Sequence, residues 1–346
     1  MSLPPIEIPL GAMRFNSDSQ KLEYWNGSAW MQIHTVSPNL AESGDAAAGV
    51  RAIVGGGAGP SGLPDEVQYF NMASSGNAAD YGDLPERQYL TAGTSSRTRG
   101  IFMGGYKNSP SFTYTNSIQA VEVASIGYTS DFGDLSQSQA GYTGSIGNST
   151  RGIRVGGTAP TNPGTNTIDY VTIAVKANAI DFGDLSGSCT NSNNINSQTR
   201  GVVQTNEAGT PNRTQLITIP TTGNAVTFGE LQKQRLDGAG MSNSVRGIFI
   251  GGSPLPVPFM EYVTISSTGN GTRFGDLSID TFREGGHASP VRGVVSGGMG
   301  PASPYPTLDT LQSVNFATEG DTVDFGDLSK GRYEHASISN GHGGLG

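Results

Sequence analysis

Two carboxylates in a short repeated motif are the first candidates for chemistry in this chain. The stretch "DFGDLS" at Asp131 to Ser136 places them three residues apart, a spacing that suits a shared metal ion or acid–base work. Its Asp-Phe-Gly tripeptide also matches the magnesium-binding element of protein kinases. A kinase needs a Gly-rich loop, a strand lysine and a His-Arg-Asp loop as well, and we find none of them in the sequence. Phosphate transfer is therefore not predicted.

The motif is one copy of a repeat. An aromatic residue, glycine, an acid and leucine recur six times, 46 to 51 residues apart. The copies begin at Tyr81, Phe132, Phe182, Phe228, Phe274 and Phe325. Repeats of this length are typical of propellers and solenoids. The residue before the aromatic varies, whereas the third motif position is always acidic, which favours a structural role over a metal site.

Six arginines match the six acids. Each arginine begins a segment such as "RGIFMGG". The arginines are Arg51, Arg99, Arg151, Arg200, Arg246 and Arg292, and the acids are Asp83, Asp134, Asp184, Glu230, Asp276 and Asp327. Ionised partners form strong hydrogen bonds, so we expect each acid to accept hydrogen bonds from an adjacent arginine or from turn amides at partly buried junctions.

The elements that position these residues are short strands. Segments such as "EYVTISSTGN" at Glu261 alternate apolar and polar residues with period two, which predicts a strand with one buried face,. A Gly-Asn pair usually follows and predicts a hairpin into the motif strand. The arginine segment supplies a third strand, and the 18 or 19 residues from each motif aromatic to the next arginine leave room for a fourth. Four strands in each of six repeats predict a six-bladed β-propeller.

This pattern resembles the kelch and galactose-oxidase-like propellers, with Phe or Tyr where that family usually has Trp. The predicted fold is all-β, with blades near 51–98, 99–150, 151–199, 200–245, 246–291 and 292–346. We expect the segment from His335 to Gly344 to complete the first blade beside Arg51 to Gly57. The resemblance speaks for architecture, because the same blade serves enzymes and binding scaffolds.

Composition narrows the function. A net charge of −9 disfavours nucleic acid,, and no segment approaches the length of apolar sequence that spans a membrane. Cys189 is the only cysteine, and His34, His287, His335 and His342 do not lie at ligand spacing, so we expect no metal, no cofactor and no enzyme. A galactose-oxidase-like or glycan-active enzyme is the minor alternative.

Length variation concentrates in one loop of each repeat. The distance from arginine to motif aromatic ranges from 28 to 33 residues, and equivalent propeller loops lie on one face. The aromatic residues there are Tyr106, Phe112, Tyr114, Phe259 and Tyr305. They suit sugar stacking or a protein interface, although exposed loops also vary without any function.

The segment before the repeats is a separate predicted module. Residues 1–36 should form a β-meander that contains both tryptophans, Trp25 and Trp30, with 37–50 as a linker. So short a segment buries little core alone, so we expect these tryptophans to attach it to other proteins or to further copies of the chain.

The module resembles segments near the N-termini of tailed-bacteriophage virion proteins, and the match runs from Gly11 to Trp30. The repeats themselves look like those of cyanophage structural proteins. This resemblance implies a virion protein made in the host cytoplasm, a tail fibre or baseplate adhesin for a host surface receptor, assembled as a trimer. The alternative is a head-decoration or tail subunit that contacts only other virion proteins.

Overall fold

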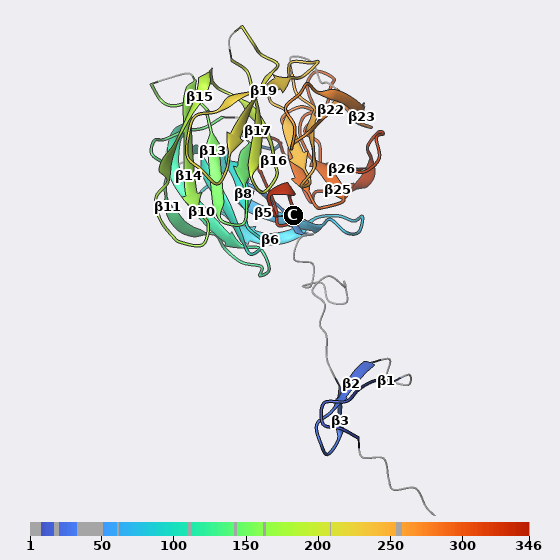
Figure 1. Cartoon of the computed structure of the whole chain (residues 1–346). Coiled ribbons are helices and arrows are strands. Elements are labelled where there is room, and N and C mark those ends of the chain that lie inside the picture. Colours follow the sequence, from blue (N-terminus) through green and yellow to red (C-terminus); the bar gives the residue numbers. More distant parts are fainter. Residues whose placement is uncertain are drawn as a thin grey trace, which may run out of the picture. The chain divides into compact units, whose positions relative to one another are not determined.

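The computed structural model describes residues 8–16, 21–32, 51–60, 62–108, 112–141, 144–161, 164–207, 209–253 and 258–345. The chain divides into two compact units, Met1–Ala47 and Ala48–Gly346 (Figure 1). Apart from one turn of 3-10 helix, η1 (Gly343–Leu345), the regular structure of the described residues is β-strand, which confirms the all-β class. The predicted linker at 37–50 lies outside the described residues. None of the described segments is a helix long and apolar enough to span a bilayer.

The first unit contains one antiparallel sheet. Its strands are β1 (Met13–Asn16), β2 (Lys21–Trp25) and β3 (Trp30–Gln32), paired in that order. Residues directly opposite one another share a face of a sheet. The pairs Met13–Tyr24, Phe15–Leu22 and Tyr24–Met31 therefore put five apolar side chains on one face.

Six antiparallel sheets make up the described part of the second unit (Figure 1). The first sheet pairs β28 (Ala336–Ser339), β4 (Arg51–Gly55), β5 (Glu66–Asn71) and β6 (Ala79–Asp83). The second pairs β11 (Ser130–Asp134), β10 (Phe112–Glu122) and β9 (Arg99–Asn108), with both β7 (Gln88–Tyr89) and β8 (Ala92–Ser95) on the far side of β9. The third consists of β12 (Ser145–Gly147), β13 (Arg151–Val155), β14 (Thr165–Thr172) and β15 (Ile180–Cys189).

The other three sheets repeat the four-stranded pattern. The fourth consists of β16 (Ser192–Asn196), β17 (Arg200–Thr205), β18 (Arg213–Thr218) and β19 (Val226–Glu230). The fifth consists of β20 (Ala239–Ser242), β21 (Arg246–Ile250), β22 (Phe259–Thr264) and β23 (Thr272–Asp276). The sixth consists of β24 (Gly285–Ala288), β25 (Arg292–Ser296), β26 (Thr310–Asn315) and β27 (Val323–Asp327).

The predicted blade boundaries are offset from these sheets. The strand before each arginine pairs with the strands after it, so β8 belongs with β9 and not with the segment 51–98. The return segment, which is the stretch of 18 or 19 residues from each motif aromatic to the next arginine, therefore passes to the next sheet before its strand begins. The predicted pairing of the C-terminal segment is confirmed, because β28 lies against β4 with Ile338 opposite Ile53.

The first strands of the six sheets adjoin one another. Contacts run from β8 through β12, β16, β20 and β24 to β28, and β28 also contacts β8. The core lies between neighbouring sheets. The apolar positions of the alternating segments form two columns in it, and all of these residues are buried. Those columns are Phe70, Val121, Val171, Ile217, Val263 and Val314, and Met72, Val123, Ile173, Ile219, Ile265 and Phe316.

Candidate functional site

The repeated motif forms a junction between neighbouring sheets. Gly133 has φ of 154° and lies so close to the carbonyl oxygen of Ala177, in the next sheet, that a side chain would not fit. The main-chain N–H of Asp134 donates to Oδ1 of Asn178 at 3.0 Å. Four further motif acids make the same contact to a side-chain oxygen, namely Asp184, Glu230, Asp276 and Asp327.

The carboxylates of the motif acids lie outside any metal site in the structure. Asp83 and Asp276 are half-buried and the other four acids are exposed. Among the described residues no group of three or more His, Cys, Asp or Glu side chains is placed to hold a metal ion. The motif therefore acts through its main chain, as a sheet-to-sheet contact.

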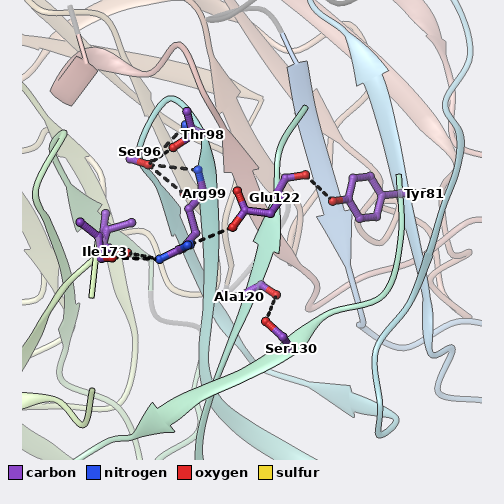
Figure 2. A network of polar contacts seen from close by, with 9 residues as sticks. Tyr81, Ser96, Thr98, Arg99, Ala120, Glu122, Ser130 and Ile173 are labelled. Carbon is purple, nitrogen blue, oxygen red and sulfur yellow. Dashed lines mark hydrogen bonds and ion pairs between the residues drawn. The ribbon is translucent and has the colours of Figure 1, made fainter. Parts of the chain in front are cut away.

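The structure differs from the predicted arginine–acid pairs. The six arginines donate instead to main-chain carbonyl oxygens of the neighbouring sheet, and Arg99 also contacts Glu122 (Figure 2). Their acceptors are Val123 for Arg51, Ile173 for Arg99, Ile219 for Arg151, Ile265 for Arg200, Phe316 for Arg246 and Met72 for Arg292. These oxygens follow the last paired residue of a strand, so they need a donor from outside their own sheet.

A cavity of about 110 Å³ lies where the first strands of the six sheets begin. It is lined by residues from the start of β8, β12, β16, β20, β24 and β28 and from the turns before them. Glycine is abundant in this wall, for example at Gly93, Gly144 and Gly240. Small residues let the strands converge, and they leave the space between them unfilled.

Unpaired polar groups gather around this cavity. The side chains of Asn193, Asn194 and Thr91 are at least nine-tenths buried, and each has an oxygen atom without a hydrogen-bond partner among the described residues. Ser337 Oγ and His335 Nδ1 also lack a partner. Buried polar atoms are normally satisfied. These atoms are closed off from solvent, so they lie behind the surface of the cavity and not on it.

Strained backbone marks the same place. Four residues other than glycine with positive φ line the cavity, namely Leu90, Asp237, Arg283 and Glu334, at φ of 55° to 63°. Main-chain hydrogen bonds link the four residues one to the next. The Arg283 N–H donates to the Asp237 carbonyl, the Glu334 N–H to the Arg283 carbonyl, and the Leu90 N–H to the Glu334 carbonyl. Strain of this kind persists where the surrounding structure enforces it and is frequent at functional sites.

The charged side chains that line the cavity are one arginine and three acids. Arg283 lies 2.9 Å from Glu334 and 3.8 Å from Asp237. Burial raises the pKa of Glu284 well above its ordinary value. Burial also lowers the pKa of His335, helped by Arg332 and His287. Burial thus favours the uncharged form of both groups.

Three of the predicted loop aromatics meet in one cluster, and none of them lines the cavity. Tyr106 and Tyr114 have ring centroids 4.2 Å apart, and Tyr89 contacts both Tyr106 and Phe112 at 5.7 and 6.2 Å. Tyr89 precedes the cavity residue Leu90. Sequence reasoning missed Tyr89, because it lies in the constant return segment and not in a variable loop.

The other two predicted aromatics lie apart from that cluster. Tyr305 contacts Phe282 at 5.5 Å, and Phe282 precedes the cavity residue Arg283. Phe259 lies beneath the guanidinium groups of Arg235 and Arg273. The aromatic residues thus form separate groups, and none of them lines the cavity.

The opposite ends of the same strands are covered by the C-terminal segment. His342 Nε2 pairs with the Ser95 carbonyl at 2.8 Å, and Arg97 donates to the carbonyl of Leu345. Gly343 and Gly344 lie too close to Asn196 and Gly147 to accept a side chain. The C-terminal segment thus covers the ends of the strands that lie away from the cavity.

The candidate attachment residues of the first unit do not lie on its apolar face. Trp25 and Trp30 contact each other at 5.6 Å, and Arg14 lies 4.2 Å above Trp30. Both tryptophans are half-buried, on the face that carries the Arg14–Glu23 ion pair. Sequence reasoning missed this apolar face. The period-two spacing of Met13 and Phe15 and of Leu22 and Tyr24 is the pattern in the sequence that could have predicted it.

No protein-family model matches the sequence, and no curated protein matches it significantly.

Proposed function

We propose that the six sheets are the blades of a closed, kelch-like, six-bladed β-propeller. The contacts between sheets support closure, because Arg292 in the sixth sheet donates to Met72 in the first at 3.2 Å. Strand β28, from the end of the chain, completes the first sheet. A pairing between the two ends of the repeat array would hold the ring shut.

We further propose that this propeller is the receptor-binding part of a phage virion protein, without catalytic activity, carried on a tail fibre or baseplate at the particle surface. The observation that carries this proposal is the clustering of loop aromatic side chains, in a unit that also contains a cavity lined by polar residues and glycines. Aromatic side chains stack on the faces of sugar rings, and polar groups in a pocket fix the orientation of the bound ligand. A host surface glycan combines both kinds of group.

The experiment is binding of residues 48–346 to candidate host cells, alongside the triple variant Tyr106→Ala, Tyr114→Ala and Tyr305→Ala. We expect loss of binding in the triple variant, by tenfold or more, since each ring contributes apolar contact area. The matched control is Tyr128→Ala, which removes a tyrosine that is 80% exposed and outside these clusters. Absence of cell binding by the unaltered protein would favour the structural subunit that contacts only virion proteins.

The first unit would attach or oligomerise the chain. Its exposed face supports this role, because Met13, Phe15 and Met31 are 60%, 66% and 44% exposed. An apolar sheet face left in water is a candidate interface. We propose that it assembles copies of this chain as a trimer, next to other virion proteins.

A further inference from the structure

We propose that residues 340–345, called the cap below, form a cover that acid releases from the ends of the first strands, with His342 as the group that responds to pH. This device concerns the second unit alone and does not depend on the receptor-binding role.

The cap is held by contacts with several sheets. Besides the close contacts of its two glycines described above, Asn340 accepts from the main-chain N–H of Arg51 at 3.0 Å and donates to the carbonyl oxygen of Arg97 at 3.2 Å. The cap meets the first five sheets at Arg51, Ser95, Gly147, Asn196 and Asn243. Because one short segment makes all of these contacts, loss of a central contact weakens the hold of the others.

His342 is bonded through both ring nitrogens, and the two nitrogens have opposite roles. Nε2 lies 2.8 Å from the carbonyl oxygen of Ser95, which can only accept,. Nδ1 lies 3.2 Å from the main-chain nitrogen of Gly344 and 3.4 Å from Nδ2 of Asn196, and both of these nitrogens are donors. The neutral ring with its proton on Nε2 therefore satisfies all three contacts.

A second proton, on Nδ1, would face the same two donors. The Gly344 group is a main-chain N–H and offers no acceptor. Asn196 is held with Nδ2 toward the ring, because this nitrogen also donates to the carbonyl oxygen of Gly147 at 2.6 Å. The charged group that acts on the ring is Arg97, which opposes another positive charge. The seated cap thus excludes the imidazolium form of His342.

The pKa of His342 gives the direction and the range of the effect. Burial lowers this pKa to about 4, Arg97 lowers it further, and the Ser95 carbonyl opposes both only in part. Release of the cap returns the pKa to its ordinary value near 6.5. The released cap therefore takes up a proton at a pH where the seated cap does not, so each pH unit from 6.5 down toward 4 favours release by up to about tenfold,.

Release of the cap changes the space between the first strands. His342 lines a second cavity, of about 50 Å³. This cavity shares Gly93, Gly240 and Ser337 with the larger cavity described above, so the two adjoin. Removal of His342 from the wall would open this space at the end that the cap covers.

The experiment is hydrogen exchange of the full chain at pH 7, 6 and 5, followed by mass spectrometry and corrected for the intrinsic effect of pH on exchange. Exchange of this kind reports local opening separately from global unfolding. We expect the protection of residues 340–345 to fall by up to about tenfold for each pH unit below 6.5. Peptides from the buried strands β14 and β22 should stay protected at all three pH values.

The variant His342→Gln tests the role of the ring. The glutamine amide both donates and accepts but does not titrate, so protection of the cap should be the same at all three pH values. If glutamine seats the cap poorly, protection is low throughout and still independent of pH. The control His287→Gln replaces another buried histidine whose pKa is lowered to about 4, and it should leave the pH dependence of the cap unchanged.

Three results would overturn the inference. The first is protection of residues 340–345 that stays the same from pH 7 to pH 5. The second is loss of protection in the cap and in the buried strands together, which would indicate acid unfolding of the whole unit. The third is a His342→Gln protein whose cap keeps the pH dependence of the unaltered chain.

Discussion

At the scale of single residues, one buried carboxyl group beside the cavity is expected to lower the stability of the fold. Glu284 is 7% exposed, and neither of its carboxyl oxygens makes a well-formed hydrogen bond within the described structure. Burial raises its pKa, and its own amide, Arg235 and the Ala239 amide oppose that rise only in part. An acid with a raised pKa destabilises the folded state as pH rises above its unfolded value near 4.5,.

Replacing this carboxyl tests the cost. We expect Glu284→Gln to raise the urea midpoint, and to raise it more at pH 8 than at pH 4.5. At the higher pH the folded protein must either keep a proton on the carboxyl or bury its charge, whereas the amide of glutamine does neither. The measurement is urea unfolding at pH 4.5, 6 and 8. An equal effect of the substitution at all three pH values would show that ionisation of the buried carboxyl does not change the free energy of unfolding.

At the scale of the elements, the junction between sheets depends on the motif glycine. Gly133→Ala should lower the free energy of unfolding by about 1–3 kcal/mol, because φ of 154° disfavours a side chain, and Ala177 occupies the space. The control is Gly127→Ala, in a position with open space around it. Thermal unfolding of both variants measures the difference, and a Gly133→Ala protein as stable as the control would refute the junction role.

The sequence predicts these elements better than the site they build. Strands such as β22 follow from strict alternation, because one buried face imposes period two on side chains such as Val263 and Ile265. The acceptors of the arginines could not be predicted, since main-chain carbonyl groups carry no sequence signal. The cavity was missed for a related reason: its wall is made of glycines and of residues with positive φ, such as Leu90, whose positions only the converging strands reveal.

At the scale of the whole molecule, the two units have different tasks. The second unit contains its own large core, while the three strands of the first leave Met13, Phe15, Leu22, Tyr24 and Met31 exposed at 40% or more. A sheet of three short strands is marginal without a covered apolar face. Burying one such side chain contributes on the order of 1.5–3 kcal/mol, so association of copies through this face would stabilise the unit.

This reasoning predicts the oligomeric state. The full chain should have three times the mass of one chain by light scattering, whereas residues 48–346 should be monomeric. Phe15→Ser with Leu22→Ser should dissociate the full chain, because two adjacent apolar contacts are lost from every copy. The control Ile126→Ser removes an apolar side chain that is 60% exposed in the second unit and should leave the mass unchanged. A full chain that is monomeric, or a double variant with unchanged mass, would place the interface elsewhere.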